Sequence, residues 1–427
     1  MAIETPNTEP LSLDTLEIVS GEHYQRHGYP HPEWTYLRKN APVYWYDRPN
    51  VDAFWAITKH ADIVQIARQP KIFLNGPRLL VSTKDQYIEG GDMLFRHLLN
   101  MDPPEHAKYR DTVNRRFTPR AVRSLEQEVQ EITNDVMDEL AASHRNGGAM
   151  IECDFVTDVS AKVPLDVIAA LLGVPKEDRQ QLFQWTNETI GSGDPEFNRG
   201  GTPQETLERA RAGLFTYFTN LVEQRRKEPK DDLTSVLGAV KLDGELLPIF
   251  ELLSYFLLLV VAGNETTRNA TSGGVHALID NPDQWKMLQS TPALLKPAIE
   301  EVVRWVSPVI QFARTASEDY VLRGQKIKAG DSMALFYPSA NRDEEVFENP
   351  FKFDITRDPN PHIAFGIGEH FCLGANLARL ELEVIFRELL KRVEYLESAG
   401  PMERLRSSFV GGIKHMPVRM KLRPRAS

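Results

Sequence analysis

One long stretch of the chain, residues 249–280, has the apolar spacing of a helix that is buried on every side. From Leu252 to Ala262 nearly every residue is apolar, so no polar face is left for water. At 1.5 Å per residue the whole stretch would be about 48 Å long. The composition then changes to Gly263-Asn264-Glu265-Thr266-Thr267, which is unfavourable for a buried helix. The pattern predicts a central helix whose middle serves something other than packing.

Other helical and strand-like patterns surround this one. Helical periodicity recurs in 129–140, 163–172 and 207–226. The β-rich runs 43–46 and 54–58 flank a Pro-Asn turn and predict a hairpin, and residues 309–315 predict a further strand. Because helical segments dominate, we expect a mainly α fold with a smaller β-rich part.

Two segments lack a regular period. Residues 73–95 are interrupted by Gly76-Pro77 and Gly90-Gly91 but keep several apolar residues, which favours a functional loop over a plain surface loop. Residues 191–204 are rich in glycine and proline, and we expect a mobile loop there.

The composition is that of an ordinary soluble protein. The chain has 427 residues, of which 41% are hydrophobic and 26% charged, so it can bury a large core. No linker, repeat or low-complexity tract divides it, and we expect one domain over residues 1–427. A net charge of −10 makes nucleic-acid binding an unfavourable hypothesis.

Cysteine usage and the N-terminal residues predict the compartment. Cys153 and Cys372 are the two cysteines, and so few thiols in so long a chain fit a reducing cytoplasm. The first twenty residues carry four acidic residues and no apolar core, unlike a signal peptide. The apolar run 252–263 is too short to span a bilayer. We therefore expect a cytoplasmic protein without a membrane anchor.

Cys372 lies in the glycine-rich segment Phe365-Gly366-Ile367-Gly368-Glu369-His370-Phe371-Cys372-Leu373-Gly374. A single cysteine is usually a small buried hydrophobic residue. Here, however, a helical pattern follows at once, and a cysteine at a helix N-terminus has its thiolate stabilised by free N–H groups and the helix dipole. A thiolate on such a loop suits an axial ligand of haem iron.

These ten positions, Phe-x-x-Gly-x-His-x-Cys-x-Gly, resemble the haem-binding signature of the cytochrome P450 family. The resemblance implies a cytochrome P450 fold, which is a triangular prism of helices with a smaller β-rich part. It implies haem b (iron protoporphyrin IX) as the cofactor and Cys372 as the metal ligand. Phe365 and His370 would lie beside the haem, with His370 facing a propionate.

Two further segments match propionate-binding positions of the family. His106 and Arg110 follow Pro-Pro-Glu at i and i+4, so they share one face of a helix for which Asp102 is the expected N-cap. From spacing alone they could equally be a solvated charged face. Arg314, in the predicted strand, matches the family's third propionate ligand.

The polar interruption of the long helix matches the family's Gly-x-Asp/Glu-Thr motif through Glu265 and Thr266. A simple helix kink with solvated polar groups is the alternative. The resemblance implies a catalytic pair, in which Thr266 holds a water near bound O₂ and Glu265 connects it to solvent as a proton relay.

Glu301 and Arg304, in a helical pattern between Pro297 and Pro308, match the Glu-x-x-Arg of the same family. Arg357 matches the second arginine that locks this pair, and we predict a structural role for all three. His362 has no zinc-like spacing to Cys372, so we expect it to be structural as well.

The resemblance also places substrate-lining residues in four parts of the chain. The expected set is Leu79, Leu80, Val81, Val260, Val261, Val309, Ile310, Phe312, Phe409 and Val410. All are apolar, and the sequences around 262–269 and 337–347 look like those of hydroxylases of steroids, terpenoids and methyl-branched lipids. A neutral, bulky apolar substrate is therefore favoured. A fatty acid anchored by Arg78 or Lys84 in the covering loop is the rival.

The reaction implied is monooxygenation, in which one atom of O₂ enters a C–H bond. The chain has no flavin or iron–sulfur motif, so a ferredoxin and its reductase are the expected electron donors, and Arg115, Arg116 and Arg379 could offer a basic docking face. A peroxide-driven haem enzyme and a non-catalytic haem sensor or carrier remain alternatives, which NADH consumption with a ferredoxin system would distinguish.

Overall fold

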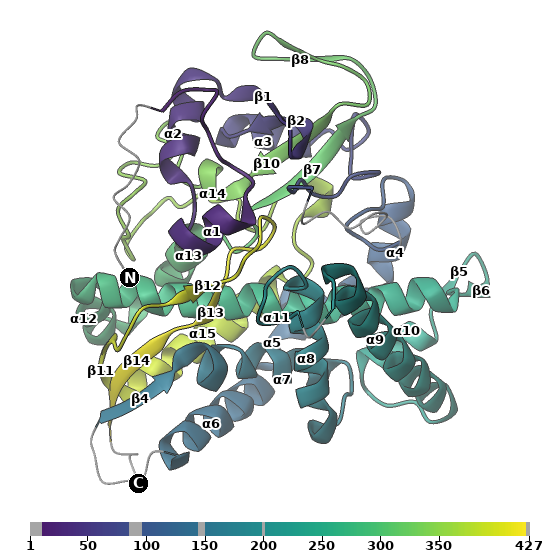
Figure 1. The fold of residues 1–427 in the computed structure, drawn as a ribbon. Helices are drawn as coiled ribbons and strands as arrows, with labels where there is room; N and C mark the ends of the chain where they lie inside the picture. The colour runs from purple at the N-terminus through teal and green to yellow at the C-terminus, as the bar shows by residue number, and fades with distance from the viewer. Residues whose placement is uncertain (1–10, 85–95, 144–149, 199–200, 424–427) are drawn as a thin grey trace.

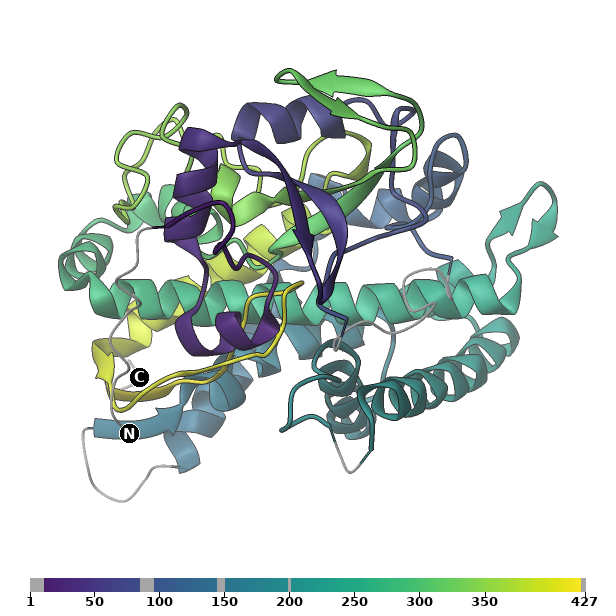
Figure 2. The same ribbon diagram turned by 45° about the horizontal axis from the view of Figure 1, so that its top comes forward.

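Helix α11 (Ile249–Asp280) runs through the middle of the computed structural model, which describes residues 11–84, 96–143, 150–198 and 201–423. Its bounds are those predicted, and Figures 1 and 2 show it crossing the molecule with other elements on both sides. By length and composition it could cross a membrane, but more than half of its most apolar window is buried inside the protein. It is therefore the expected core helix.

Several helices pack directly against α11. They are α7 (Lys162–Leu171), α9 (Pro203–Lys227), α13 (Leu295–Val306) and α15 (Ala375–Arg392). Two glycines of α11 permit close approach: a Cβ at Gly273 would lie 2.7 Å from Val306, and one at Gly274 would lie 2.7 Å from Val302. A larger residue at either position would push α13 away from the central helix.

The other α-helices of the described residues complete the helical part. They are α1 (Gly21–His27), α2 (His31–Asn40), α3 (His60–Ala67), α4 (Glu105–Asn114), α5 (Pro119–Arg123), α6 (Glu126–Ser143), α8 (Arg179–Ile190), α10 (Leu233–Gly238), α12 (Pro282–Ser290) and α14 (Tyr337–Ala340). The helical segments predicted at 129–140, 163–172 and 207–226 are confirmed as α6, α7 and α9, with differences of a few residues at their ends.

A five-stranded sheet forms the larger β-rich part. Its order is β1 (Val43–Arg48), β2 (Val51–Ile57), β10 (Ser332–Phe336), β7 (Gln311–Ala316) and β3 (Phe73–Leu74). The predicted hairpin is confirmed, since β1 and β2 pair antiparallel. The strand predicted at 309–315 begins only at Gln311, because Val309 instead makes an isolated bridge to Val410.

Strands from three distant parts of the chain form a second sheet, in the order β11 (Val393–Ser398), β14 (Pro417–Leu422) and β4 (Met150–Asp154). Cys153 lies in β4, where burial raises the pKa of its thiol to about 12. A buried thiol that stays protonated is unreactive, so Cys153 has a structural role. Two short hairpins, β5 (Lys241–Leu242) with β6 (Glu245–Leu246) and β8 (Tyr320–Leu322) with β9 (Gln325–Ile327), lie at the periphery (Figure 1).

The segment 405–412 connects β12 (Glu403–Arg404) to β13 (Ile413–His415) and reaches toward α11. Its tip is tied to the chain before β7, because the N–H of Gly411 donates to the carbonyl of Pro308 at 2.8 Å and that of Ile310 to Phe409 at 2.8 Å. Tyr29 packs against the same tip, where its hydroxyl occupies the place that a side chain at Gly411 would need. That hydroxyl donates to the carbonyl of Ser307 at 2.9 Å.

Asp102 does not cap α4, contrary to our prediction. The helix begins at Glu105, and its N-cap makes no side-chain hydrogen bond. The carboxylate of Asp102 instead accepts from the backbone N–H of Asn75 at 2.7 Å and from that of Gly76 at 3.4 Å. It therefore ties the loop after β3 to the start of α4.

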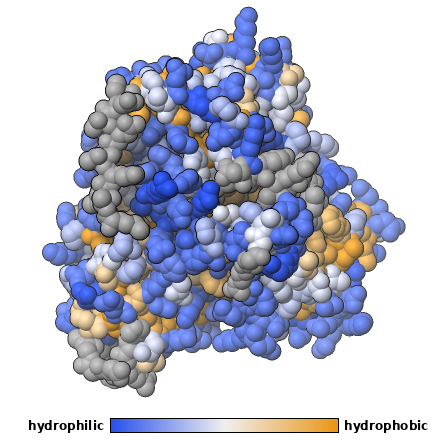
Figure 3. All heavy atoms as spheres, in the orientation of Figure 1, coloured by the Kyte–Doolittle hydropathy of each residue, from blue (hydrophilic) through white to orange (hydrophobic). Residues whose placement is uncertain are grey.

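The loop expected at 191–204 ends earlier than predicted. Thr202 caps α9 through a capping box with Glu205, so Pro203 and Gln204 are already helical. Of the loop expected at 73–95, residues 85–95 lie outside the described part of the chain. Hydrophilic residues cover most of the face shown in Figure 3, as the composition predicts.

Candidate active site

The loop before α15 holds Cys372 in a fixed position. The backbone N–H of Cys372 donates to the carbonyl of Phe365 at 2.9 Å, which closes the glycine-rich segment on itself. Gly366 and Gly368 have φ of 69° and 77°, a region that side chains disfavour. A side chain at Gly368 would also clash with the backbone of Ala67 in α3. Glycine is therefore required there by both backbone conformation and space.

Burial dominates the ionisation of Cys372. It raises the pKa of the thiol, while the N–H of Gly374 and the guanidinium groups of Arg110 and Arg379 act in the opposite direction. The start of the helix does lower the pKa of Cys372, as we predicted, but burial raises it by more. In the protein alone the thiol is the favoured form, so a thiolate here requires a further positive charge, which a metal ion would provide.

Four cationic or potentially cationic side chains converge near this loop, as the family resemblance implied. His106 and Arg110 come from α4, Arg314 from β7 and His370 from the turn before Cys372. The rings of His106 and His370 lie 4.1 Å apart between centroids. Arg110 donates to the carbonyl of Phe371 at 2.7 Å, and Arg314 is almost fully buried. We call these four residues the cationic cluster.

The two histidines of the cationic cluster are buried, and each has a ring nitrogen without a hydrogen-bond partner in the described structure. Burial, followed by the positive charges of Arg314, His106 and Arg110 in that order, lowers the pKa of His370 to about 2. Burial also lowers the pKa of His106, although Glu369, 3.1 Å from its Nδ1, acts in the other direction. The Nε2 atoms of both rings are buried without a hydrogen-bond partner in the described structure. A group that carries carboxylates would satisfy these atoms, so the residues present fit the propionates of a haem.

Helix α11 separates the two residues of the expected acid–alcohol pair. Thr266 donates to the carbonyl of Ala262 at 3.0 Å on a side of the helix that is not packed. Glu265 is buried on another side, where it forms an ion pair with Arg268. Arg268 in turn donates to the side chain of Asn187 in α8 at 2.9 Å. Burial raises the pKa of Glu265, and Arg268 lowers it by less. The acid therefore does not reach open solvent directly, contrary to our prediction that Glu265 connects Thr266 to solvent.

The predicted Glu301–Arg304–Arg357 triad is confirmed. Arg304 binds both carboxylate oxygens of Glu301 at 2.7 Å, and Arg357 binds Glu301 at 3.1 Å. Glu301 also accepts from the backbone N–H of Asp354 at 2.9 Å. These contacts attach the long segment before Phe365 to α13.

His362 takes part in a neighbouring network on the same side. Its Nε2 lies 3.0 Å from Glu300, which Arg379 binds through two N–H groups at 2.6 and 2.9 Å. His362 therefore has the structural role that we predicted. Arg379 is engaged by Glu300, and Arg116 pairs with Asp231 at 2.9 Å, so two of the three arginines proposed for partner docking already have acidic partners.

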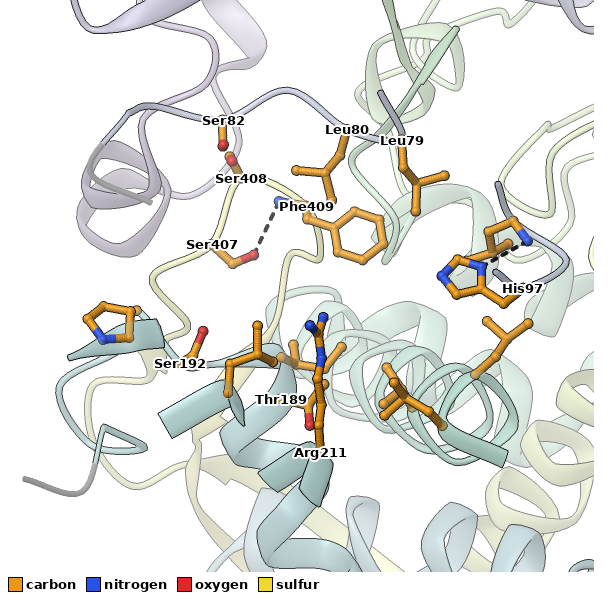
Figure 4. A pocket seen from close by; sticks show the side chains of 18 of the residues that line it. Leu79, Leu80, Ser82, His97, Thr189, Ser192, Arg211, Ser407, Ser408 and Phe409 are labelled. Atoms are coloured by element: carbon orange, nitrogen blue, oxygen red, sulfur yellow. Dashed lines mark hydrogen bonds between the residues drawn. The ribbon is translucent and has the colours of Figure 1, made fainter. Parts of the chain in front are cut away.

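A cavity of about 240 Å³ lies beside α11 (Figure 4). Its walls come from the loop after β3, α8, α9, α11 and the 405–412 segment. The lining residues are Leu79, Leu80, Ser82, His97, Leu99, Thr189, Ile190, Ser192, Gly193, Pro203, Leu207, Arg211, Leu257, Leu258, Val261, Arg406, Ser407, Ser408 and Phe409. Leu257, Leu258 and Val261 are the residues of α11 that line the cavity, and Thr266, five residues after Val261, is not among the lining residues.

The predicted substrate-lining residues divide into two groups. Leu79, Leu80, Val261 and Phe409 line the cavity. Val81, Val260, Ile310 and Val410 are buried in packed contacts, and Val309 and Phe312 are partly buried outside this cavity. The residues in packed contacts are as apolar as those that line the cavity. The sequence pattern therefore does not distinguish the two groups, and the fold determines which residues face the cavity and which face the core.

The sequence analysis missed the polar part of the cavity wall. Arg211, His97 and several serines line it, so the expectation of a wholly apolar wall is wrong. A signal was present, because Arg211 interrupts the apolar stripe formed by Leu207, Leu214 and Phe218 on α9. Arg78 and Lys84 face elsewhere: Arg78 donates to the carbonyl of Asp52 at 3.2 Å and Lys84 to that of Pro49 at 3.2 Å.

The fold and this site define a protein that can hold a carboxylate-bearing cofactor next to a cysteine, beside a cavity along α11. Comparison with known proteins agrees. A family model described as Cytochrome P450 matches residues 82–409. A Rhodococcus jostii steroid C26-monooxygenase is 40% identical over 427 residues, which cover 98% of this chain and 87% of that protein.

Two other relatives are similar over nearly the whole chain. A Mycobacterium tuberculosis methyl-branched lipid omega-hydroxylase is 40% identical over 390 residues, covering 90% of this chain and 89% of that protein. The structure of a Mycobacterium marinum cytochrome P450 in complex with pseudoionone has a TM-score of 0.87 and 34% identity, covering 96% and 99% of the two chains. The chain belongs to the cytochrome P450 family and is a monooxygenase, a class that uses haem and O₂.

Proposed function

We propose that this monooxygenase hydroxylates a bulky apolar molecule of isoprenoid or steroid type, with haem b held by Cys372 and by the cationic cluster. The overall reaction takes R–H, O₂, two electrons and two protons to R–OH and water. The observation that carries the proposal is the apolar wall of Leu79, Leu258, Val261 and Phe409, which lies beside α11. Relatives that act on steroids and methyl-branched lipids support it.

The residues of the chain have separate tasks in this proposal. When bound, the haem would supply the activation of O₂. His106, Arg110, Arg314 and His370 would hold its propionates, and Phe365 would pack beside it. Thr266 would hold a water and pass a proton from its hydroxyl. Glu265, the proposed proton relay, would have to leave its ion pair with Arg268 to serve that water. The apolar walls exclude other water from the reacting C–H bond.

Binding of a bulky apolar ligand is the first test. A steroid and a monoterpene alcohol, titrated into the haem-loaded protein, should convert the haem spectrum from low to high spin, because burial of the ligand displaces water from the cavity. A long-chain fatty acid serves as the comparison. A spin shift with the straight-chain fatty acid alone would contradict the proposal.

The role of Thr266 has a separate test. Thr266→Ala should bind substrate as before and consume O₂, but a larger share of the NADH consumed should appear as hydrogen peroxide, because proton delivery is lost. Thr216→Ala is the matched control, since Thr216 makes the same bond to a carbonyl four residues earlier on an exposed face of α9. Unchanged coupling of NADH to product in Thr266→Ala would exclude this role.

Electrons would come from a ferredoxin and its reductase, and the protein would work in the cytoplasm. Arg115 is the exposed arginine of the proposed docking set for which the described structure gives no acidic partner. Product formation with NADH and a ferredoxin system would support this hypothesis. Turnover with hydrogen peroxide alone would favour a peroxide-driven enzyme, and binding without turnover would favour a sensor or carrier.

A further inference from the structure

Asp194 connects two segments of the cavity wall that are far apart in the sequence. Ser192 and Gly193, in the segment 191–198 after α8, line the cavity, as do residues 406–409 of the 405–412 segment (Figure 4). Asp194 directly follows the first pair and is fully buried. Its contacts therefore determine how these two parts of the wall lie relative to each other.

The carboxylate of Asp194 binds at both ends of the 405–412 segment. Its Oδ2 accepts from the backbone N–H of Arg406 at 3.0 Å. Its Oδ1 accepts from the ammonium group of Lys414, two residues beyond the segment, at 3.0 Å, and from the backbone N–H of Glu196 at 3.0 Å. We call the bonds from Asp194 to Arg406 and Lys414 the clamp.

Lys414 is an unusual residue for a buried position in the short strand β13. Lysine is almost never buried unless it is paired. Here Glu196 is a second acidic partner, 3.0 Å from Nζ and in the same segment as Asp194. Burial lowers the pKa of Lys414, but the hydrogen bonds to Glu196 and Asp194 raise it by more. Lys414 therefore stays charged inside the protein, and removal of its buried partner would be costly.

Close packing beside the clamp joins the same two segments. A Cβ at Gly191 would lie 3.3 Å from the buried side chain of Leu405, and closer still to Phe197. At its other end the 405–412 segment is held by the bond from Gly411 to Pro308. The segment is thus fixed at its tip by the chain before β7 and at its base by the clamp.

The cavity that the clamp leaves is small for the proposed substrate. Its volume of about 240 Å³ is below the range of roughly 300–1,000 Å³ that is usual for ligand pockets. A steroid-sized ligand therefore requires the walls to move apart. The walls that belong to α9 and α11 are held in the helical core, whereas the segments 191–198 and 405–412 are irregular connections that lose fewer contacts when they move.

We propose that Asp194 and Lys414 are positioning residues that determine substrate size, because the clamp holds these two wall segments together. This rests on the proposed function and specifies its selectivity. A small apolar ligand binds with the clamp closed, whereas a large one must first separate the segments and break a charge-assisted bond. Neither residue is among those that line the cavity, so each acts through the segment that carries it.

The test compares progesterone and citronellol, a large and a small neutral ligand, titrated into the haem-loaded protein with calorimetry beside the haem spectrum. Asp194→Asn and Lys414→Met should each raise the affinity for progesterone relative to citronellol by about tenfold, the equivalent of one charge-assisted hydrogen bond. The double variant Asp194→Asn/Lys414→Met leaves no uncompensated charge in the clamp. It should regain much of the melting temperature that the single variants lose, and keep their changed ratio of affinities.

Asp232→Asn is the matched control, because Asp232 forms an equally buried ion pair with Arg225 and neither residue lines the cavity. It should lower the melting temperature and leave the ratio of affinities unchanged.

Three results would overturn the role of the clamp. They are an unchanged ratio in Asp194→Asn, an equal change of the ratio in Asp232→Asn, and a return to the wild-type ratio in the double variant, which would mean that only stability had been affected. If the wild-type protein binds neither ligand, the proposed function itself fails, so the two failures are distinguishable.

Discussion

The cationic cluster and the cavity beside α11 both place positive charge inside the protein, but they are built differently. In the cluster, four side chains from three elements converge, and two of their ring nitrogens are buried without partners. Its arginines and histidines are held by α4, β7 and the closed loop before α15. In the cavity, Arg211 reaches inward from one helix, opposite segments without regular structure.

The difference separates a fixed site from an adjustable one. Changing a residue in the cluster leaves other buried charges facing one another, so we expect large losses of cofactor or stability there. Changing Arg211 alters one side chain of the cavity wall while the rest of the wall remains, so we expect a smaller effect there. The following experiments test this contrast, from the largest expected effect to the smallest.

The loop of Cys372 should show the largest effect. Cys372→Ala removes the only thiol beside the cationic cluster in the described chain, so the reduced, CO-treated protein should lose the strongly red-shifted Soret band of a thiolate-ligated haem. Cys153→Ala is the control and should keep the band, because Cys153 lies in β4. If Cys372→Ala keeps the band, the assignment of the ligand is wrong.

Glu301→Gln should destabilise the protein by about 3–5 kcal/mol, because it leaves Arg304 and Arg357 buried without their carboxylate. Chemical denaturation followed by tryptophan fluorescence measures the free energy of unfolding. Glu300→Gln, at the neighbouring and more exposed carboxylate, should have a clearly smaller effect. If Glu300→Gln lowers the free energy of unfolding as much as Glu301→Gln does, burial of the triad does not increase its contribution to stability.

Arg314→Leu should weaken haem retention by about 1.5–3 kcal/mol, since it removes a charge-assisted bond to a propionate. Transfer of haem to an excess of apomyoglobin measures the rate of loss. An exposed arginine, Arg419, provides the control through Arg419→Leu. A rate equal to that of the wild-type protein in Arg314→Leu would remove this residue from the propionate site.

The smallest effect should come from His415, which joins β13 to the segment before α9. Burial lowers its pKa, but Asp154 and Glu196, at 2.5 and 2.9 Å, raise it by more. A histidine with a raised pKa stabilises the folded state below its unfolded value of about 6.5 and loses that contribution as pH rises through the folded value. The melting temperature of the wild-type protein should therefore exceed that of His415→Gln near pH 6 and converge with it above pH 8. A constant difference across this range would contradict the assignment.

The cluster was predictable from the sequence and the cavity only in part, for a physical reason. His106 and Arg110 are one helical turn apart, and Phe365, His370 and Cys372 lie within eight residues, so local geometry brings each set together. The meeting of these two sets with Arg314 was implied by the family resemblance. The long helix 249–280 was predictable because its apolar residues leave no polar face. By contrast, Val260 and Val261 are adjacent and equally apolar, yet one packs in the core and the other lines the cavity. The pairing of Glu265 with Arg268, and of Asp102 with the loop after β3, likewise depended on neighbours that the pattern does not reveal.

The contact between Tyr29 and the tip at Gly411 has a practical consequence for engineering. Residues before the first strand are commonly trimmed to improve expression. Here they support the segment that carries Ser407, Ser408 and Phe409 to the cavity. A truncation that removes Tyr29 would therefore alter substrate selectivity, although Tyr29 is far from Cys372 in the sequence. Graded substitutions at position 29 offer a way to enlarge the cavity without changing the residues that line it.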